Sequence, residues 1–322
     1  GAAYSGMQAF MTTYGTLGFF PKILIAPGYS QNPEAAAAEL ALAESLRAMA
    51  LIDSPPATAP ATAIANRGAA GNSFDTSSNR AILCYPQETF YDTGLVPTSV
   101  GLNGTTPVPA VANRNAIGPY SQWVAGAMAA KDLANGYWWS PSNTPINEIF
   151  GPDVTLYASL LDAASDVNNL NAAGIVTVFN AFGTGLRVWG NRTAAYPATT
   201  TPANFISVRR TMDVIEESVE LAMLQFIDQP ISNALITAIL ASVNAFVRTL
   251  IQRGALIAGS ASYDPAENPA SQVAAGQLVF DIDVMPPPPA ERLTFNVYID
   301  TTLLSGLSGS AGSNSNSLTA AA

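Results

Sequence analysis

Histidine is absent from the 322 residues of this sequence. A Ser-His-Asp triad therefore cannot be assembled, and the usual histidine-containing zinc sites are excluded as well. The single cysteine, Cys84, lies in the apolar run from Ala81 to Tyr85 and is expected to be a small buried residue. With one cysteine no intrachain disulfide can form, and we predict no catalytic, cofactor-binding or metal-binding residue.

Charge is also scarce. Charged residues make up 11% of the chain, and only two of them, Lys22 and Lys131, are lysines. An ordinary soluble domain has roughly 25% charged residues, so the surface must be unusually neutral, which suits permanent contact with neighbouring subunits. The net charge of -10 argues against nucleic acid as a partner, because binding to phosphates needs clustered Lys and Arg.

Long apolar runs are missing too. No stretch comes near the roughly 18 apolar residues of a membrane span, and no signal peptide is recognisable, so direct membrane insertion is not expected. The chain begins at Gly1 instead of Met, which indicates a cut, processed or renumbered chain.

The best organised stretch is a pair of long helices. Between residues 205 and 226, and again between 231 and 250, apolar residues recur at steps of three and four and so mark one face of each helix. Arg253 lies in the last turn of the second pattern, and Gly254 stands where a left-handed C-cap belongs. Each buried side chain contributes roughly 1.5 to 3 kcal/mol, so we expect the two helices to pack on each other.

Upstream of this pair the patterns alternate between strands and helices. Continuous apolar strands, as opposed to alternating ones, indicate a mostly parallel sheet covered by helices on both faces, and hence an α/β domain. The expected strands cover residues 22–26, 51–53, 80–85, 174–179 and 185–193, the last two forming a hairpin; the expected helices start at Asn32-Pro33, cover 119–136 and cover about 155–171.

The last part of the chain contains two further β patterns, at 277–284 and 293–299, separated by four prolines at 286–289. A long loop is expected at 92–118, and the Ser/Gly/Asn-rich tail from 305 to 322 has little power to fold alone.

Three groups of side chains invite a chemical interpretation. Asp281 and Asp283 face one side of a strand, and could hold a cation or act as paired acids, although a solvent-facing or partner-facing position is favoured. Asp162 and Asp166 are expected to be a solvated pair on a helix face. The aromatic run Tyr137 to Trp139 could be an exposed binding cluster, but aromatic residues at a helix exit usually fill core.

Several motifs resemble the contractile tail sheath proteins of bacteriophages, and they occur in that family's order and spacing. They are Lys22 to Gly28, Ile52 to Ser54, Tyr120 to Gly136, Ser140 to Asn143, Leu186 to Thr193, Phe205 to Arg210 with Ile215 to Glu217, Gly254 to Leu256, Ala275 to Asp283 and Pro286 to Leu293.

The resemblance implies a fold and a division of the chain. Residues 1–203 would form the family's middle α/β domain, of subtilisin-like topology without a protease triad. Residues 204–300 would form an α+β C-terminal domain with the long helix pair and closing strands, and 301–322 a terminal arm. Family members carry an N-terminal arm, and often another domain, before the strand matched by Lys22 to Ala26, where only about twenty residues stand here.

The implied function is mechanical and not enzymatic. Sheath subunits form stacked rings around a tail tube and contract, and terminal arms add strands to neighbouring subunits. The implied partners are further copies of the chain, the tube protein, the baseplate and the tail terminator, in a virion tail assembled in the host cytoplasm. Leu303, Leu304 and Leu307 are the expected arm contacts. The expected tube-facing charges, on an exposed side of the helix pair, are Arg209, Arg210, Asp213, Glu217, Glu220 and Arg253.

Other functions remain open at this point. The same motifs fit the sheath of a phage-derived injection machine, such as an R-type bacteriocin or a type VI-like system. From a different class, an α/β hydrolase-like enzyme using Asp and Ser residues is the alternative, which electron microscopy of the particles would distinguish.

Overall fold

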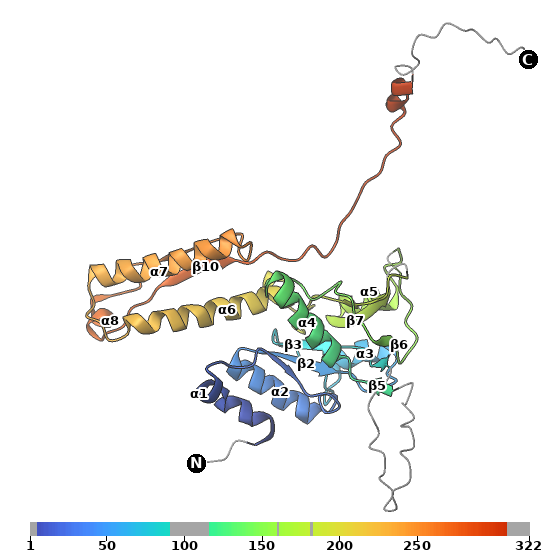
Figure 1. Ribbon diagram of the computed structural model, residues 1–322, viewed down its shortest axis with the longest axis horizontal. Coiled ribbons are helices and arrows are strands. Elements are labelled where there is room, and N and C mark those ends of the chain that lie inside the picture. The colour runs from blue at the N-terminus through green and yellow to red at the C-terminus, as the bar shows by residue number, and fades with distance from the viewer. Residues whose placement is uncertain (1–4, 91–115, 160, 181–182, 308–322) are drawn as a thin grey trace, which may run out of the picture. The chain divides into compact units, whose positions relative to one another are not determined.

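The computed structural model describes residues 5–90, 116–159, 161–180 and 183–307 (Figure 1). Its contacts divide the chain into a unit of residues 1–289 and a second unit of residues 290–322, and each is described by itself. Most of the loop expected at 92–118 and nearly all of the tail expected at 305–322 lie outside the described residues.

A five-stranded sheet forms the centre of the first unit, in the order β1-β2-β3-β7-β8. The first four strands run parallel and β8 closes the sheet antiparallel to β7, as the sequence predicts. The strands β2 and β3 are buried along their whole length, which explains their unbroken apolar sequence. The five strands are Ile23–Ile25, Met49–Asp53, Ala81–Cys84, Ile175–Asn180 and Leu186–Trp189.

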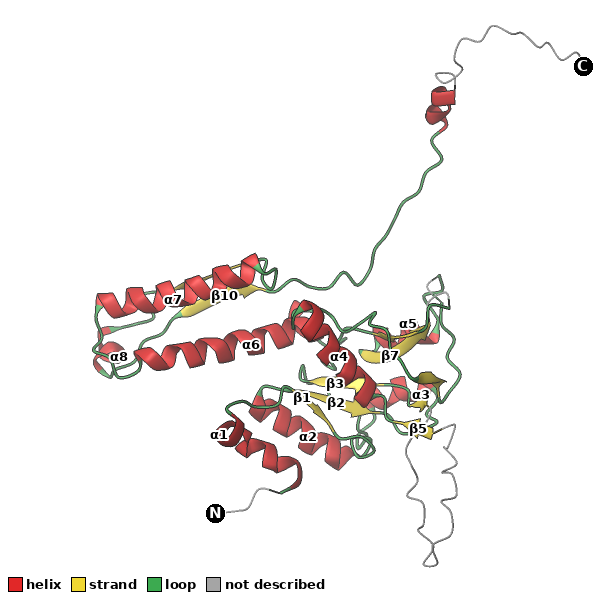
Figure 2. Ribbon diagram, viewed as in Figure 1, coloured by secondary structure: helices red, strands yellow, loops and turns green. Residues whose placement is uncertain are grey.

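Helices cover both faces of this sheet (Figure 2). On one face α4, Ser121–Asn135, packs Val124 and Met128 against Leu51 and Ile82. On the other face α3, Pro60–Ala65, and α5, Asp166–Ala172, pack against the alternate side chains, such as Ile52 and Leu83. The helix α2, Pro33–Leu46, starts at Asn32, whose side-chain oxygen accepts from the Glu34 amide as an N-cap.

Shorter elements complete this part of the unit. A small sheet in the order β5-β4-β6 comprises Ala116–Gly118, Glu88–Phe90 and Ile149–Pro152. The remaining pieces are α1, Thr13–Leu17, and the 3-10 turns Gly6–Thr12, Asn66–Gly68 and Pro202–Asn204.

The predicted helix pair is confirmed as α6, Ile206–Met223, and α7, Asn233–Gln252, joined through a 3-10 turn at Leu224–Phe226. Ile215 of α6 shares one buried cluster with Val243, Val247 and Leu250 of α7. Gly254 adopts φ 79°, the left-handed conformation expected just after a helix end. We call this part, with β9, α8 and β10 at Ala258–Ser262, Ala270–Ala274 and Asp281–Met285, the C-terminal lobe.

Three sequence predictions about elements are wrong. The helix predicted from about residue 155 begins only at Asp166, because the Ser165 hydroxyl caps it there. Asp162 and Asp166 are therefore no helix-face pair: Asp162 accepts from the Ala164 amide in a turn, and Asp166 accepts from the Tyr157 amide. Within the described residues 293–299 no strand forms, and the second unit has one 3-10 stretch, Thr301–Leu307.

The partner of β10 was also not predicted. It is β9, whose sequence Ala-Gly-Ser-Ala-Ser lacks the branched and aromatic residues typical of strands, and β10 itself begins at Asp281 instead of at 277.

The expectation that no segment could span a membrane needs correction as well. By length and composition alone, α7 is apolar enough to cross one. One face of α7 is buried against β9, in the apolar cluster that also holds Ile215 of α6, which gives a different reason for its apolar sequence.

Candidate inter-subunit surfaces

The two-stranded sheet β9-β10 has two outer edges, and a side chain of α7 binds the backbone at the edge of β9. Asn244 of α7 accepts from the Ala261 amide at 2.9 Å and donates to the Ala261 carbonyl at 3.0 Å. Ala261 therefore directs its backbone groups away from its partner Ile282, and the pair is of the non-hydrogen-bonded type. In such a pair Ile282 must also direct its amide and carbonyl outward, on the far edge of β10.

The same alternation applies to Val284, whose partner on β9 is Gly259. A Cβ at Gly259 would lie 2.8 Å from the Asp283 carbonyl and 3.2 Å from Val247, so glycine permits the close approach of β9 to α7 and β10. The helix thus covers β9, while β10 presents backbone donors and acceptors at Ile282 and Val284.

Large apolar side chains of the second unit are exposed. Leu293, Phe295, Val297 and Ile299 alternate with polar residues except Tyr298, and their exposed fractions range from 70% for Leu293 to 97% for Ile299. The predicted arm residues Leu303 and Leu304 are exposed as well, and the side chain of Leu307 lies outside the described residues. Residues 293–299 thus have the sequence pattern of a half-buried strand but are not paired in a sheet.

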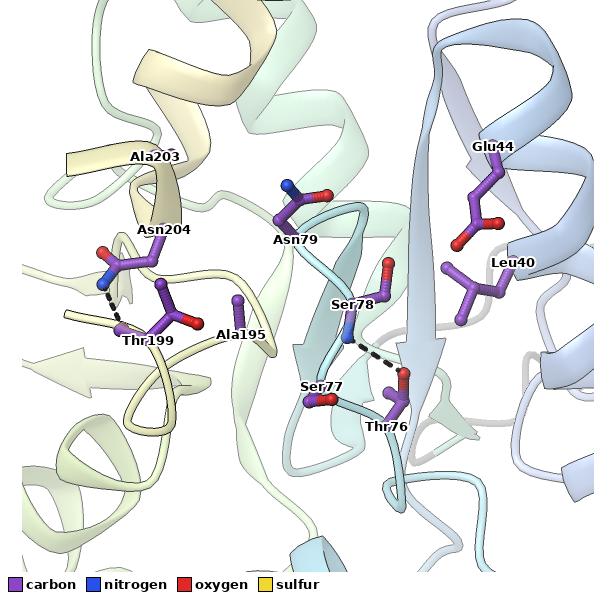
Figure 3. A pocket seen from close by; sticks show the side chains of 10 residues that line it. All are labelled: Leu40, Glu44, Thr76, Ser77, Ser78, Asn79, Ala195, Thr199, Ala203 and Asn204. Carbon is purple, nitrogen blue, oxygen red and sulfur yellow. Dashed lines mark hydrogen bonds between the residues drawn. The ribbon is translucent and has the colours of Figure 1, made fainter. Parts of the chain in front are cut away.

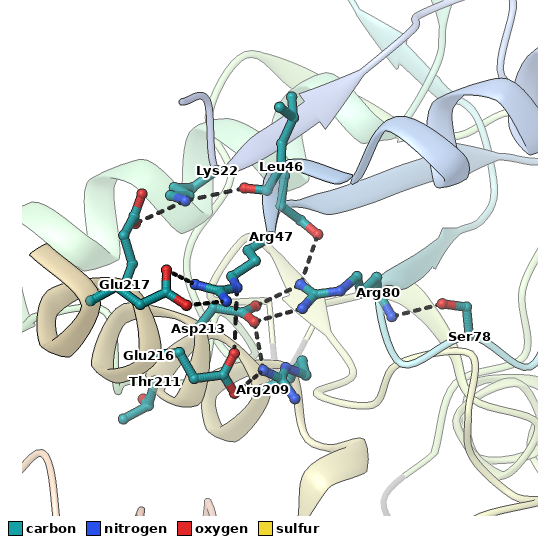
Figure 4. A network of polar contacts seen from close by, with 12 residues as sticks. Lys22, Leu46, Arg47, Ser78, Arg80, Arg209, Thr211, Asp213, Glu216 and Glu217 are labelled. Carbon is teal, nitrogen blue, oxygen red and sulfur yellow. Dashed lines mark hydrogen bonds and ion pairs between the residues drawn. The ribbon is translucent and has the colours of Figure 1, made fainter. Parts of the chain in front are cut away.

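Most of the predicted tube-facing charges form ion pairs within the chain instead of lying on an open surface (Figure 4). Arg80 donates two hydrogen bonds to Asp213, at 2.9 and 2.8 Å, and Arg209 donates a third at 2.6 Å. Lys22 pairs with Glu217 at 2.9 Å. We call this set the ionic seam; its members are Lys22, Arg47, Arg80, Arg209, Asp213, Glu216, Glu217 and Glu220.

Arg47 belongs to the exposed part of the seam. Its guanidinium holds Glu220 with two hydrogen bonds of 2.7 and 2.6 Å. This contact raises the pKa of Arg47 and lowers the pKa of Glu220. Glu220 remains 62% exposed, so solvent screens the pair.

Arg210 makes a separate bidentate pair with Asp132 of α4. Asp213 and Arg210 are buried, so the expectation that all six charges lie on an exposed side is wrong for these two. The reason is that helical periodicity identifies one face of α6 but not what covers it. Of the six, Glu220 and Arg253 are exposed, and contact of any of them with a tube stays a prediction.

The aromatic run at the exit of α4 divides between core and surface. Trp138 packs in the cluster that holds Ile215 and Val243, and Tyr137 meets it edge to face with ring centroids 5.1 Å apart. Trp139 is half exposed beneath the ammonium of Lys131. Tyr137, Trp138 and Trp139 therefore do not form one exposed aromatic cluster.

Buried acids are the feature that sequence reasoning missed. Asp53, at the carboxyl end of β2, accepts from the Ser121 amide and hydroxyl at 2.7 and 2.6 Å and from the Ser30 hydroxyl at 2.9 Å. Burial, followed by the charge of Asp53, raises the pKa of Glu39 to about 8, and burial with the charge of Asp153 raises that of Glu88 to about 9. No sequence pattern distinguishes these carboxyls from surface ones.

This group of acids and serines is closed to substrate, because Asp53, Ser30 and Ser121 are each at most 1% exposed. Burial raises the pKa of Cys84 well above its usual value, which disfavours the thiolate a nucleophile needs. Among the described residues no group of three acidic or cysteine side chains could hold a metal ion.

An open pocket of about 530 Å³ lies between α2, the segment before β3 and the loop before α6 (Figure 3). Hydroxyls and amides dominate its lining, with Glu44 as its one ionisable side chain; Ser78 donates its amide to the Thr76 hydroxyl, and Asn204 donates to the Thr199 carbonyl. The lining contains no paired acid and base for general catalysis.

Comparison with known proteins identifies the class to which this fold belongs. The family model described as the phage tail sheath protein central domain matches residues 2–194, and the one described as the phage tail sheath C-terminal domain matches residues 198–300. The chain therefore belongs to the phage tail sheath family, which confirms the resemblance seen in its motifs.

Individual relatives agree. The tail sheath protein of Burkholderia phage BcepMu is 44% identical over 306 residues, covering 95% of this chain and 61% of the relative. A putative prophage major tail sheath protein of Pseudomonas aeruginosa strain UCBPP-PA14 is 29% identical over 295 residues, covering 92% of this chain and 69% of the relative. The chain thus spans 61% to 69% of the length of these two curated relatives.

Solved structures support the same fold. The helical sheath of the anti-feeding prophage in its contracted state matches with a TM-score of 0.65 and 21% identity, over 91% of this chain and 73% of that one. The contracted sheath complex of the extracellular contractile injection system PVC matches with a TM-score of 0.65 and 20% identity, over 87% and 71%. These likenesses establish a mixed α/β fold with a mostly parallel sheet flanked by helices.

Proposed function

We propose that this chain is the subunit of a contractile sheath, which polymerises as stacked rings around a tail tube and contracts to drive the tube through a bacterial envelope. The middle domain covers residues 1–203, with subtilisin-like topology and no catalytic role, the C-terminal domain covers 204–300, and 301–322 form an arm. The subunit acts in a virion tail assembled in the host cytoplasm, with the tube protein, baseplate and tail terminator as partners. Family membership is the basis of this proposal.

The main structural support for this proposal is that two parts of the chain could pair between subunits. Residues 293–299 have the apolar alternation of a half-buried strand but are exposed, and β10 presents outward backbone groups at Ile282 and Val284. A strand from one subunit added to β10 of the next would satisfy both, since main-chain hydrogen bonds hold an added strand at an open sheet edge. Such a link tolerates rotation of the bodies it joins.

The test is assembly of the purified chain in the presence of isolated tail tubes, followed by negative-stain electron microscopy. Rings or tubes of regular diameter are expected. Removal of residues 293–322, which takes away the alternating apolar segment together with the arm, should abolish them without changing the melting temperature, and normal tubes from the truncated chain would refute the added strand.

The sheath of a phage-derived injection machine remains the second candidate. It is supported by the matches to the anti-feeding prophage and PVC sheaths. The neighbouring genes distinguish the two, because a phage encodes capsid proteins beside its sheath.

The alternative function, a hydrolase, is disfavoured by burial. Where serine hydroxyls bind an aspartate in the described part of the chain, at Asp53, Ser30 and Ser121, all three side chains are closed to solvent. We expect no turnover of peptide or ester substrates. Turnover that a single serine replacement abolishes would contradict this.

A further inference from the structure

The bases that bind α6 share one location in the fold. Lys22 directly precedes β1, Arg47 stands two residues before β2 and Arg80 directly precedes β3. Because these strands are parallel, their amino ends meet at one edge of the sheet, so the three cations lie along that edge. Figure 4 shows their side chains converging on α6.

The acids of α6 have the matching spacing. Asp213, Glu216, Glu217 and Glu220 lie at intervals of three and four residues and therefore share one helix face. From Asp213 to Glu220 the helix rises about 10 Å, and two strand intervals measure about 10 Å as well. The acidic face of α6 and the basic edge of the sheet are thus complementary in charge and in length.

Asp213 is the centre of this contact. Its side chain is 3% exposed, and it takes both Arg80 nitrogens and Arg209 as donors. A buried carboxylate is stable only when it is paired in this way, and removing a partner leaves a buried charge uncompensated. The outer pairs, by contrast, are a quarter or more exposed on both sides.

A second attachment holds α6 from another element. Arg210, next to Arg209, pairs with Asp132 of α4, and Trp138, just beyond α4, packs among the apolar side chains of the C-terminal lobe. The helix itself belongs to both cores, since Ile206 lies in the core of the central sheet and Ile215 in that of the lobe. Two attachments on different elements oppose rotation of α6 about either one.

Five of the 13 basic residues of the chain form these ion pairs; they are Lys22, Arg47, Arg80, Arg209 and Arg210. We propose that the ionic seam fixes the direction of α6, and with it the C-terminal lobe, relative to the central sheet. Asp213 with Arg80 forms a permanent inner contact, and the exposed pairs form an outer contact that salt weakens. Two domains of one chain move relative to each other by default. We expect the ion pairs of the seam to suppress this motion, so that the central sheet and the C-terminal lobe move as one body.

The test measures the distance between the two parts in the full chain. Spin labels are placed at Ser45→Cys on α2 and Thr237→Cys on α7, two exposed positions, while buried Cys84 stays unlabelled. The unaltered seam should give one narrow distance distribution. Asp213→Asn should broaden it about twofold, as an unlocked interdomain contact would. The matched control is Glu267→Gln, which changes an exposed carboxylate of the lobe away from α6 and should leave the distribution narrow.

The outer contact allows a test that does not disturb the buried charge. Lys22→Glu or Glu217→Lys alone should broaden the distribution, and the double exchange should narrow it again because the pair is restored with reversed signs. About 1 M salt, with a screening length near 3 Å, should broaden the wild type slightly and Asp213→Asn strongly. If Asp213→Asn does not fold, the Lys22 and Glu217 exchange decides the matter. Narrow distributions in both single exchanges at high salt would overturn the proposal.

Discussion

The guanidinium of Arg67 donates to the carbonyl of Ala194 at 2.7 Å, across 127 positions of sequence. The same side chain donates to the carbonyls of Tyr196 and Ala173, at 2.7 and 2.8 Å, and to those of Phe74 and Thr76. Burial lowers the pKa of Arg67. One cation thus holds three chain segments by their backbone oxygens.

We predict that Arg67→Met lowers the free energy of unfolding by about 3 kcal/mol, because it leaves buried carbonyls without donors. Urea unfolding followed by tryptophan fluorescence measures the change. Arg187→Met is the matched control: Arg187 bonds Asn143 at the surface, and its loss should cost less than about 1 kcal/mol. Equal stabilities of the two variants would show that Arg67 does not hold these segments together.

The second prediction concerns Glu39 and pH. Glu39 titrates near 4.5 when exposed, and its pKa in the folded chain is about 8, so the folded state holds a proton that the unfolded state has lost. The stability from this proton is present in full below pH 4.5 and declines as pH rises to about 8. Glu39→Gln cannot ionise, and at pH 8 it should be about 4 kcal/mol more stable than the wild type.

The measurement is urea unfolding at pH 5 and pH 8. Glu44→Gln, on the exposed side of the same helix, should leave the pH dependence unchanged. A wild-type chain as stable at pH 8 as at pH 5 would contradict burial of an uncharged Glu39.

The third prediction tests the open edge of β10. Ile282→Pro removes an amide that points away from β9, so the two-stranded sheet loses no ladder bond, but an added strand loses a donor. Ile282→Ala removes the same packing and keeps the amide. We expect both variants to fold with similarly lowered melting temperatures, and only the proline variant to fail in sheath assembly seen by electron microscopy. Assembly by both would place the added strand elsewhere.

The sequence predicted the elements whose pattern follows from their own burial. The strands β2 and β3 are buried throughout and read as apolar runs, and Asn32 with Pro33 marks the start of α2 without tertiary help. By contrast β9 is held by outside contacts: Asn244 bonds Ala261, and α7 packs on the strand. Its own residues therefore carry no strand signal.

The charged residues illustrate the same limit. Periodicity places Asp213, Glu217 and Glu220 on one face of α6, which the structure confirms. Apart from Arg209 of α6 itself, however, their cations come from more than 130 residues earlier, at Lys22, Arg47 and Arg80. Whether a helix face meets solvent, a tube or its own sheet is decided by tertiary contacts that spacing cannot express.

The last prediction concerns Arg253, the exposed cation among the proposed tube-facing charges. It follows α7 directly and is the C-cap residue, so its charge also lies near the negative end of the helix dipole. An exposed ion pair contributes only about 0 to 1 kcal/mol, but a sheath would repeat it at every subunit. The contacts would therefore add up along the tube, while each one alone is weak enough to break when the tube slides.

We expect Arg253→Glu to reduce assembly on isolated tubes at low salt and to lose most of this effect at about 1 M salt, where charges are screened. Arg253→Gln should reduce assembly less, and the melting temperature of the free chain should change by no more than the helix-dipole contribution, about 0.3 to 1 kcal/mol in free energy. Cosedimentation with tubes across a salt series measures the difference. Undiminished assembly of Arg253→Glu at low salt would remove Arg253 from the tube-facing surface.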